Sequence, residues 1–258
     1  ETVSSGRVAV INGGGRGAFA GTAFDVLRDY EEVFDPDLVI VQVYIGNDFY
    51  DAIGSASVEA SQRGIGYLLE RRHDDRGSWL RTLKDQVTKL RSLDLLFDVA
   101  SRMGPVDRCL VRRGWRWDTR HLLLIRPPPV EHALFRIELD ALTEMASWLR
   151  QRGVPTAVLL IPFREQLLAP ERLIAGLHDA ERPNRLLRDA LSNEGVPTLD
   201  LFPIYQQLDN DELAQLYFDR DLHWTAAGHE HAATELATFV VDQFGDARGN
   251  CGVTQGAA

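Results

Sequence analysis

The residues best suited to catalysis lie in one segment near the C-terminus, residues 218–229 (FDRDLHWTAAGH). Within it, Asp221 precedes His223 by two residues, just ahead of a predicted helix. A carboxylate so placed can accept one imidazole N–H, fix the tautomer and leave the second ring nitrogen as a general base. The spacing therefore indicates an acid–base pair, although the same pattern also occurs in surface loops that have no catalytic role.

A metal site is an alternative use of this segment, whose acidic and histidine side chains are Asp219, Asp221, His223, His229 and His231. Two of these, His229 and His231, are two residues apart on the predicted helix and therefore point in different directions. They cannot form one face of a metal cage. The sequence accordingly predicts no metal and no other cofactor.

Two other segments carry groups that can stabilise an oxyanion. The loop Ile45-Gly46-Asn47-Asp48 follows an apolar run. An Asn side chain in such a loop can donate to the oxygen of a transition state, a contribution of about 3–4 kcal/mol in serine proteases. An ordinary Asn-Asp turn is the alternative interpretation. The glycine cluster at residues 12–17 (NGGGRG) allows backbone N–H groups to approach a ligand closely.

Together these segments resemble the conserved blocks of the SGNH hydrolases, also called GDSL-like lipases and esterases. Residues 12–17 are similar to the family's second block, which implies that the Gly17 N–H is an oxyanion donor. Gly46-Asn47-Asp48 is similar to the third block, which implies that the Asn47 side chain is another donor. The resemblance covers residues 7–51 and about 133–244, and it implies a Ser-His-Asp triad.

The acid and base of that triad fall on residues 221–224 (DLHW), which resemble the family's last block and imply Asp221 and His223. The commonest family spacing places the Asp three residues before the His, where this chain has Arg220. A spacing of two matches a variant in the branch that includes polysaccharide O-acetyltransferase-like members. Asp219 is a less favoured substitute.

The nucleophile of the triad is missing, because no serine of the chain lies in a Gly-Asp-Ser block. In the family, the strand that carries this block precedes the strand predicted here at 7–11 and lies beside the strand predicted at 38–44. We therefore expect the serine and the first strand upstream of Glu1, in a longer protein. The 258-residue chain alone is expected to fold poorly and to lack esterase activity.

The elements that must position these residues alternate between apolar β-rich runs and amphipathic helical stripes. This order predicts an α/β fold, a flavodoxin-like three-layer α/β/α arrangement with a parallel sheet. Ligands then bind at the carboxyl ends of the strands, where the three motifs lie. Strands are expected at residues 7–11, 38–44, 155–161 and 197–201, and helices from the glycine cluster to residue 30 and over about 135–149, 184–193 and 225–244.

The domain organisation follows from the same pass along the chain. Residues 1–244 are predicted to form a single SGNH-like α/β domain. Within it, residues 51–130 are a helical or irregular insertion, with one amphipathic helix near 79–103 that either caps the site or packs on the core. Residues 245–258 are predicted to be a flexible tail.

Charge and composition exclude several classes of function. The net charge of −10 and the lack of a basic stripe argue against nucleic acid as a partner. No apolar run reaches the roughly 18 residues of a transmembrane helix. Cys109 and Cys251 fit no metal or redox spacing. The sequence leaves the cellular compartment open.

The predicted function is hydrolysis or transfer of an O-acyl group, foremost acetyl, on a carbohydrate or small-molecule ester. Arg164, after the strand at 155–161, is a candidate for binding an anionic or sugar substrate. Trp224 is placed either to stack on a sugar ring or to shield the base. One alternative is a non-catalytic SGNH-like module for carbohydrate binding or assembly. Another, less favoured, is a dinucleotide-binding enzyme, whose Gly-x-Gly-x-x-Ala pattern at 13–18 lacks an acidic residue at the end of the next strand.

Overall fold

The structure is a computed structural model of the chain, and it describes residues 9–15, 18–46, 48–49, 123–124, 129–168, 173, 175–218 and 223–245. All of them belong to one compact unit, formed by residues 1–52 and 122–258.

A parallel sheet of three strands, in the spatial order β1-β2-β3, forms the middle layer. β1 and β2 are short, mainly apolar runs, as expected where helices cover both faces of a parallel sheet. The register pairs Val39 with Thr156 at one end of β1 and Tyr44 with Ile161 at the other. The predicted strands at 38–44, 155–161 and 197–201 are thereby confirmed as β1 (Val39–Tyr44), β2 (Thr156–Ile161) and β3 (Thr198–Asp200).

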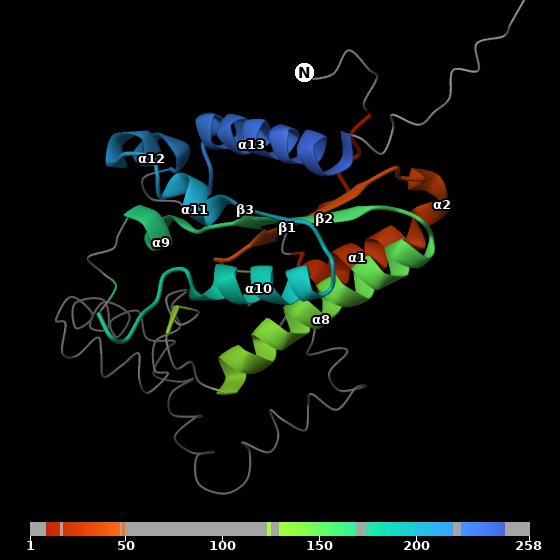
Figure 1. The fold of residues 1–258 in the computed structure, drawn as a ribbon, viewed down its shortest axis with the longest axis horizontal. Helices are drawn as coiled ribbons and strands as arrows, with labels where there is room; N and C mark the ends of the chain where they lie inside the picture. The colour runs from red at the N-terminus through yellow and green to blue at the C-terminus, as the bar shows by residue number, and fades with distance from the viewer. Residues whose placement is uncertain are drawn as a thin grey trace, which may run out of the picture. The chain divides into compact units, whose positions relative to one another are not determined.

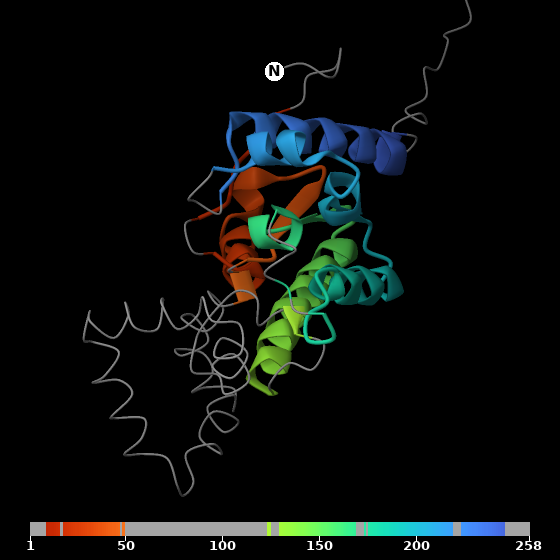
Figure 2. The same ribbon diagram turned by 90° about the vertical axis from the view of Figure 1, so that its left-hand side faces the viewer.

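Helices cover both faces of the sheet, so that the described unit has three layers (Figure 1). Figure 2, turned by 90°, shows the same separation, with the blue helices on one side of the strands and the green helices on the other. One layer contains α1 (Ala20–Asp29), α8 (Pro129–Gln151) and α10 (Arg182–Asn193). The opposite layer contains α11 (Leu201–Tyr205), α12 (Asn210–Leu216) and α13 (Ala226–Phe244). The short helices α2 (Glu31–Phe34) and α9 (Arg164–Leu168) follow α1 and β2.

The core is organised around β2, in which residues 157–161 are all buried. Because side chains alternate along a strand, Leu159 and Ile161 share one face and Val158 and Leu160 the other. The first pair packs into a cluster with aromatic and aliphatic side chains of the α11–α13 layer, including Tyr205. The α/β class and the three-layer arrangement predicted from the sequence are confirmed.

The strand predicted at 7–11 is wrong for its described part, residues 9–11, which form no strand. Val10 and Ile11 are 87% and 59% exposed. A strand needs a neighbour for its backbone N–H and C=O groups. Among the described residues β1 is bonded along one edge only, to β2, and no partner pairs with residues 9–11.

Several predictions fall outside the described residues. The expected helix near 79–103, most of the 51–130 insertion, and the tail beyond residue 245 all lie there, so the predicted domain boundaries remain predictions. No helix in the described part of the chain is both long and apolar enough to span a bilayer.

Candidate active site

His223 lies at the end of a short antiparallel bridge that precedes α13. Tyr217 and Trp224 form the bridge. The Phe218 N–H donates to the His223 carbonyl at 3.1 Å, and the Thr225 N–H donates to the Leu216 carbonyl at 2.9 Å. The backbone of the predicted base is therefore fixed by hydrogen bonds, while its residue is exposed to solvent.

The first turn of α13 packs closely against this bridge and is hydrogen-bonded to the residues before it. The Thr225 hydroxyl caps the helix by accepting from the Gly228 N–H at 3.3 Å, and it donates to the Gln215 carbonyl at 2.6 Å. A Cβ atom at position 228 would collide with the Leu216 carbonyl oxygen and crowd the Trp224 side chain. Gly228 is therefore required by the close approach of the helix to the bridge.

The carboxyl end of β2 connects this bridge to the loop after β1. The Tyr217 hydroxyl donates to the Pro162 carbonyl at 2.8 Å. The preceding carbonyl, that of Ile161, accepts from the Ile45 N–H at 2.9 Å. Two successive carbonyls thus accept from Ile45, the residue before the segment 46–48, and from Tyr217, whose bridge partner Trp224 ends the segment 221–224.

Trp224, the residue after His223, belongs to an aromatic cluster with Tyr205, Tyr217 and His231. Trp224 is half-buried, with its ring 6.3 Å from that of Tyr205, which also meets the His231 ring edge-on at 5.3 Å. Burial raises the pKa of both tyrosines, so each remains a neutral hydroxyl at ordinary pH. The Tyr205 hydroxyl and the His231 Nδ1 are buried without a hydrogen-bond partner among the described residues.

The two predicted oxyanion donors, Gly17 and Asn47, lie outside the described residues, but their neighbours are placed. In the glycine segment, the Asn12 side chain accepts from the Gly14 N–H at 2.9 Å. In the loop after β1, Asp48 Oδ2 accepts from the Tyr44 N–H at 2.7 Å. Both segments are thus folded back by a side-chain oxygen on the backbone, as turns built by Asn and Asp are.

Glu138 of α8 reaches the same region and was missed by the sequence analysis. Its side chain is fully buried, and its two oxygens accept from the Ala20 N–H, the first amide of α1, at 3.2 and 3.3 Å. Burial, and then the negative charge of Asp48, raise the pKa of this carboxyl group to about 8. One turn earlier on α8, Phe135 stacks on the buried Phe49, with ring centroids 5.6 Å apart.

Arg164 begins α9, directly after β2, as the sequence predicted. It is half-buried, and its Nε atom forms no hydrogen bond within the described residues. The neighbouring Glu165 lies near enough to the aromatic cluster for its charge to contribute to the raised pKa of Tyr217. This arrangement places a cation at the edge of the sheet that also holds His223.

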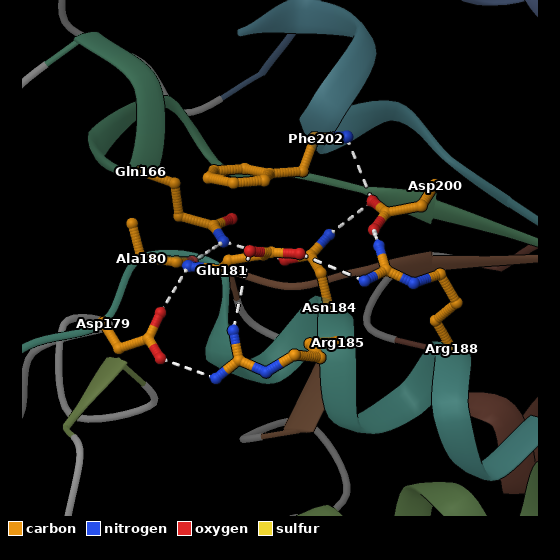
Figure 3. Close-up of polar contacts among 9 residues, drawn as sticks. All are labelled: Gln166, Asp179, Ala180, Glu181, Asn184, Arg185, Arg188, Asp200 and Phe202. Atoms are coloured by element: carbon orange, nitrogen blue, oxygen red, sulfur yellow. Dashed lines mark hydrogen bonds and ion pairs between the residues drawn. The ribbon is translucent and has the colours of Figure 1, made fainter.

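A buried polar network, the α10 network, fixes α9 and the carboxyl end of β3 (Figure 3). Gln166 Oε1 accepts from the Phe163 N–H at 2.9 Å, and its amide donates to the Ala180 carbonyl and to Asn184 Oδ1. Asn184 in turn donates to Asp200 Oδ1 at 2.8 Å. The buried polar side chains of the network are therefore bonded to one another in a chain.

Asp200 ends this chain of hydrogen bonds. Its carboxylate caps α11 by accepting from the Phe202 N–H at 3.0 Å, and it forms an ion pair with Arg188 at 2.8 Å. Arg188 also contacts Glu181, which brings a second carboxylate to the cation (Figure 3). Burial raises the pKa of Asp200, whereas the Phe202 amide, Asn184 and Arg188 act in the opposite direction.

Of the predicted site residues, the structure places His223, Trp224 and Arg164, whereas Asp221, Gly17 and Asn47 lie outside its described part. The geometry of the predicted triad and oxyanion hole therefore stays a prediction. Within the described ranges, no group of three or more His, Cys, Asp or Glu side chains is arranged to hold a metal ion.

The comparisons with known proteins point to one family. The family model described as "SGNH hydrolase-like domain, acetyltransferase AlgX" matches residues 112–255, which is more than half of the chain. Neither the curated proteins nor the solved structures contain a match to the chain.

Proposed function

Because the chain belongs to the family of SGNH hydrolase-like domains named for the acetyltransferase AlgX, we propose that it forms the catalytic domain of a serine-dependent enzyme that transfers or hydrolyses an O-acyl ester. The acyl group is acetyl, and the substrate is a carbohydrate or another small ester. The family name supports acetyl transfer, and no cofactor is required for this chemistry.

The proposed mechanism uses a serine upstream of Glu1 as nucleophile. Its Oγ attacks the acyl carbon while His223 takes the hydroxyl proton. Asp221 orients the imidazole and stabilises its charged form, and the Gly17 N–H and the Asn47 amide hold the oxyanion. The tetrahedral intermediate expels the alcohol, which receives the proton from His223. An acceptor hydroxyl or water then attacks the acyl-serine, giving its proton to His223, and the serine regains it.

The observation that carries this proposal is the pair of carbonyls at the end of β2. Pro162 is bonded to the bridge before His223, and Ile161 is bonded to the loop that precedes Asn47. A base and an oxyanion donor must converge on one carbonyl carbon, and parallel strands bring such loops to the same edge.

Substrate binding is assigned in the same proposal to Arg164 and Trp224. Arg164 presents a partly buried guanidinium to a carboxylate, a phosphate or a sugar hydroxyl. Trp224 shields one side of the His223 side chain from solvent. Its ring is held in place by packing against Tyr205 and, edge-on with the centroids 5.5 Å apart, against His229.

The proposal is tested by treating the full-length protein with a fluorophosphonate probe and locating the labelled serine by mass spectrometry. We expect one labelled serine, located before Glu1, and hydrolysis of p-nitrophenyl acetate. His223→Ala should lower both rates by at least about 10³-fold, because the base is lost. Glu230→Gln is the control, since this exposed residue also lies in the first turns of α13; it should change the rates less than about threefold.

Two results would contradict the proposal. Labelling that persists in His223→Ala would mean that this histidine does not activate the serine. Absence of labelling together with saturable binding of an acetylated oligosaccharide would favour the non-catalytic carbohydrate-binding module instead.

A further inference from the structure

The two faces of the bridge before α13 have different surroundings. Tyr217 lies opposite Trp224, and the next pair across the bridge is formed by Phe218, whose N–H donates to the His223 carbonyl. Since side chains alternate along extended chains, these two pairs lie on opposite faces. Burial agrees with this division, because Tyr217 is 2% exposed whereas Phe218 is 51% exposed. The bridge therefore has a buried face and an outer face, and the predicted base lies on the outer one.

On the buried face, the side chain of Tyr217 reaches the end of the sheet. Its hydroxyl donates to the Pro162 carbonyl at 2.8 Å, and both residues are buried. Pro162 directly follows β2, the strand that is paired with β1 on one side and with β3 on the other. A buried carbonyl that loses its donor meets no water, so this bond is costly to break. It attaches the bridge to the central strand.

The same end of β2 also holds the loop after β1. The Ile161 carbonyl, one residue before Pro162, accepts from the Ile45 N–H at 2.9 Å. Both acceptors belong to successive residues of one chain segment. The bridge and the loop after β1 are therefore held at a set separation from each other.

We propose that Tyr217 is a positioning residue, whose hydroxyl bond to Pro162 fixes the bridge that carries His223 against the end of β2, beside the loop that leads to Asn47. The attachment of the bridge is a property of the described residues alone. Its effect on catalysis rests on the proposed function. In this role Tyr217 touches no reacting atom and acts through the backbone of the bridge.

A second tyrosine of the aromatic cluster provides a matched control. Tyr205 is as fully buried as Tyr217, but its hydroxyl forms no hydrogen bond within the described residues. Tyr217→Phe and Tyr205→Phe therefore remove the same atom from the same cluster, and only the first breaks the attachment to β2. Removal of an unpaired buried hydroxyl costs little, whereas Tyr217→Phe leaves the Pro162 carbonyl without this donor.

The first measurement is amide hydrogen exchange of the full-length protein, followed by NMR. The Phe218 and Thr225 amides, which form the bonds of the bridge, should exchange about tenfold faster in Tyr217→Phe. In Tyr205→Phe they should exchange at the wild-type rate. The Ile45 amide, which donates to Ile161, is the internal reference and should keep its rate in both variants.

The second measurement separates positioning from a mere loss of folded protein. With p-nitrophenyl acetate, Tyr217→Phe should lower kcat about 10- to 100-fold and change KM less than about twofold, because a displaced base weakens the transition state and not substrate binding. The fluorophosphonate probe should label the same final fraction of this variant as of the wild type, but more slowly. Tyr205→Phe should stay within about twofold of the wild type in each quantity.

A third variant keeps the test decisive if Tyr217→Phe does not fold. The amino acid para-aminophenylalanine at position 217 keeps an N–H donor where the tyrosine has its hydroxyl. It should return the exchange rates and kcat to within about threefold of the wild type. If it behaves as Tyr217→Phe does, the hydrogen bond to Pro162 is not what positions the bridge, and the proposal is wrong.

Four other results would overturn the proposal. They are unchanged exchange at Phe218 and Thr225 in Tyr217→Phe, an equal acceleration at Ile45, an equal loss of kcat in Tyr205→Phe, and a labelled fraction that falls as much as kcat does. A full-length wild type without any activity contradicts the proposed function instead. The exchange rates then decide alone whether Tyr217 attaches the bridge to β2.

Discussion

Two buried carboxyl groups, Asp200 at the end of β3 and Glu138 on α8, have opposite electrostatic surroundings. Asp200 accepts from a backbone amide and from Asn184, and it is paired with the Arg188 cation. Glu138 accepts one forked bond from the Ala20 amide, and the negative charge of Asp48 adds to the rise of its pKa. Burial raises the pKa of both groups, and among the described residues Asp200 has a cation, Arg188, that acts against this rise.

The difference shows what a neighbouring charge does to a buried carboxyl group. With a cation beside it, the group keeps the same contacts over a wide pH range, and with a like charge nearby its contacts depend on its protonation. A buried carboxylate with a cation and full hydrogen bonding holds its neighbours in place over a wide pH range. A buried carboxyl group beside a like charge keeps its proton instead, and its contacts change when that proton leaves. The α10 network fixes the loops after β2 and β3, whereas Glu138 accepts from the first amide of α1, three residues after the predicted oxyanion donor Gly17.

Replacement of the central amide of the α10 network should have the largest effect on stability. Asn184→Leu leaves Gln166 and Asp200 buried without a shared partner, so we expect a loss of about 3 to 5 kcal/mol in the free energy of unfolding. Urea denaturation at pH 7 measures it. Asn193→Leu, on an exposed position of the same helix, should cost less than about 1 kcal/mol. Equal losses in the free energy of unfolding of the two variants would mean that the α10 network does not stabilise the fold.

The second-largest effect should be the decrease in the free energy of unfolding that Glu138 causes as the pH rises. Its pKa is about 8 in the fold and 4.5 ordinarily, so between these values the folded state holds a proton that the unfolded state has lost. The stabilisation is therefore complete below pH 4.5 and is lost as the pH rises through 8. The difference between these two pKa values limits the loss in the free energy of unfolding to about 5 kcal/mol. Relaxation of the buried site should reduce this loss to about 2 to 3 kcal/mol.

The measurement compares urea denaturation at pH 5 and pH 9 in the wild type and in Glu138→Gln. The variant should lose markedly less stability over this range than the wild type, and Glu144→Gln, at an exposed position of the same helix, should behave as the wild type does. If the wild type and Glu138→Gln lost the same amount, Glu138 would not be the group that titrates.

The smallest expected effect concerns the cation of the α10 network. Arg188→Gln removes the charge that faces the buried Asp200, and we expect a loss of about 1 to 2 kcal/mol at pH 7, because the two remaining donors still satisfy the carboxylate. Arg185→Gln is the matched control, since its partners Asp179 and Glu181 are partly exposed. That variant should lose about 0.5 kcal/mol or less in urea denaturation, and a larger loss than in Arg188→Gln would reverse the comparison.

Elements with a strong apolar pattern could be predicted from the sequence. The runs that became β1 and β2 and the stripes of α8, α10 and α13 are signals of local composition, and the structure has each of them within a few residues. The strand expected at 7–11 failed because β-propensity alone provides no hydrogen-bonding partner. Short helices such as α9 and α11, of five residues each, have too few positions to show a period.

The buried polar groups were missed for a different reason. Asn184 lies three residues before Leu187 and seven before Leu191, which are both buried on the inner face of α10. Glu138 lies four residues before Leu142 and seven before Met145, which are both buried on α8. A polar residue inside an apolar stripe was therefore the available signal. Which partner each one would meet depends on contacts between segments far apart in the chain, and the local pattern contains no information about these.

The bridge before α13 makes the place of the predicted base depend on a residue without a side chain. The Phe218 N–H donates to the His223 carbonyl, and the Thr225 N–H donates to the Leu216 carbonyl. That same Leu216 carbonyl oxygen lies where a Cβ atom of residue 228 would have to go. A larger residue at position 228 must therefore displace either α13 or the bridge, and the backbone of His223 moves with the bridge.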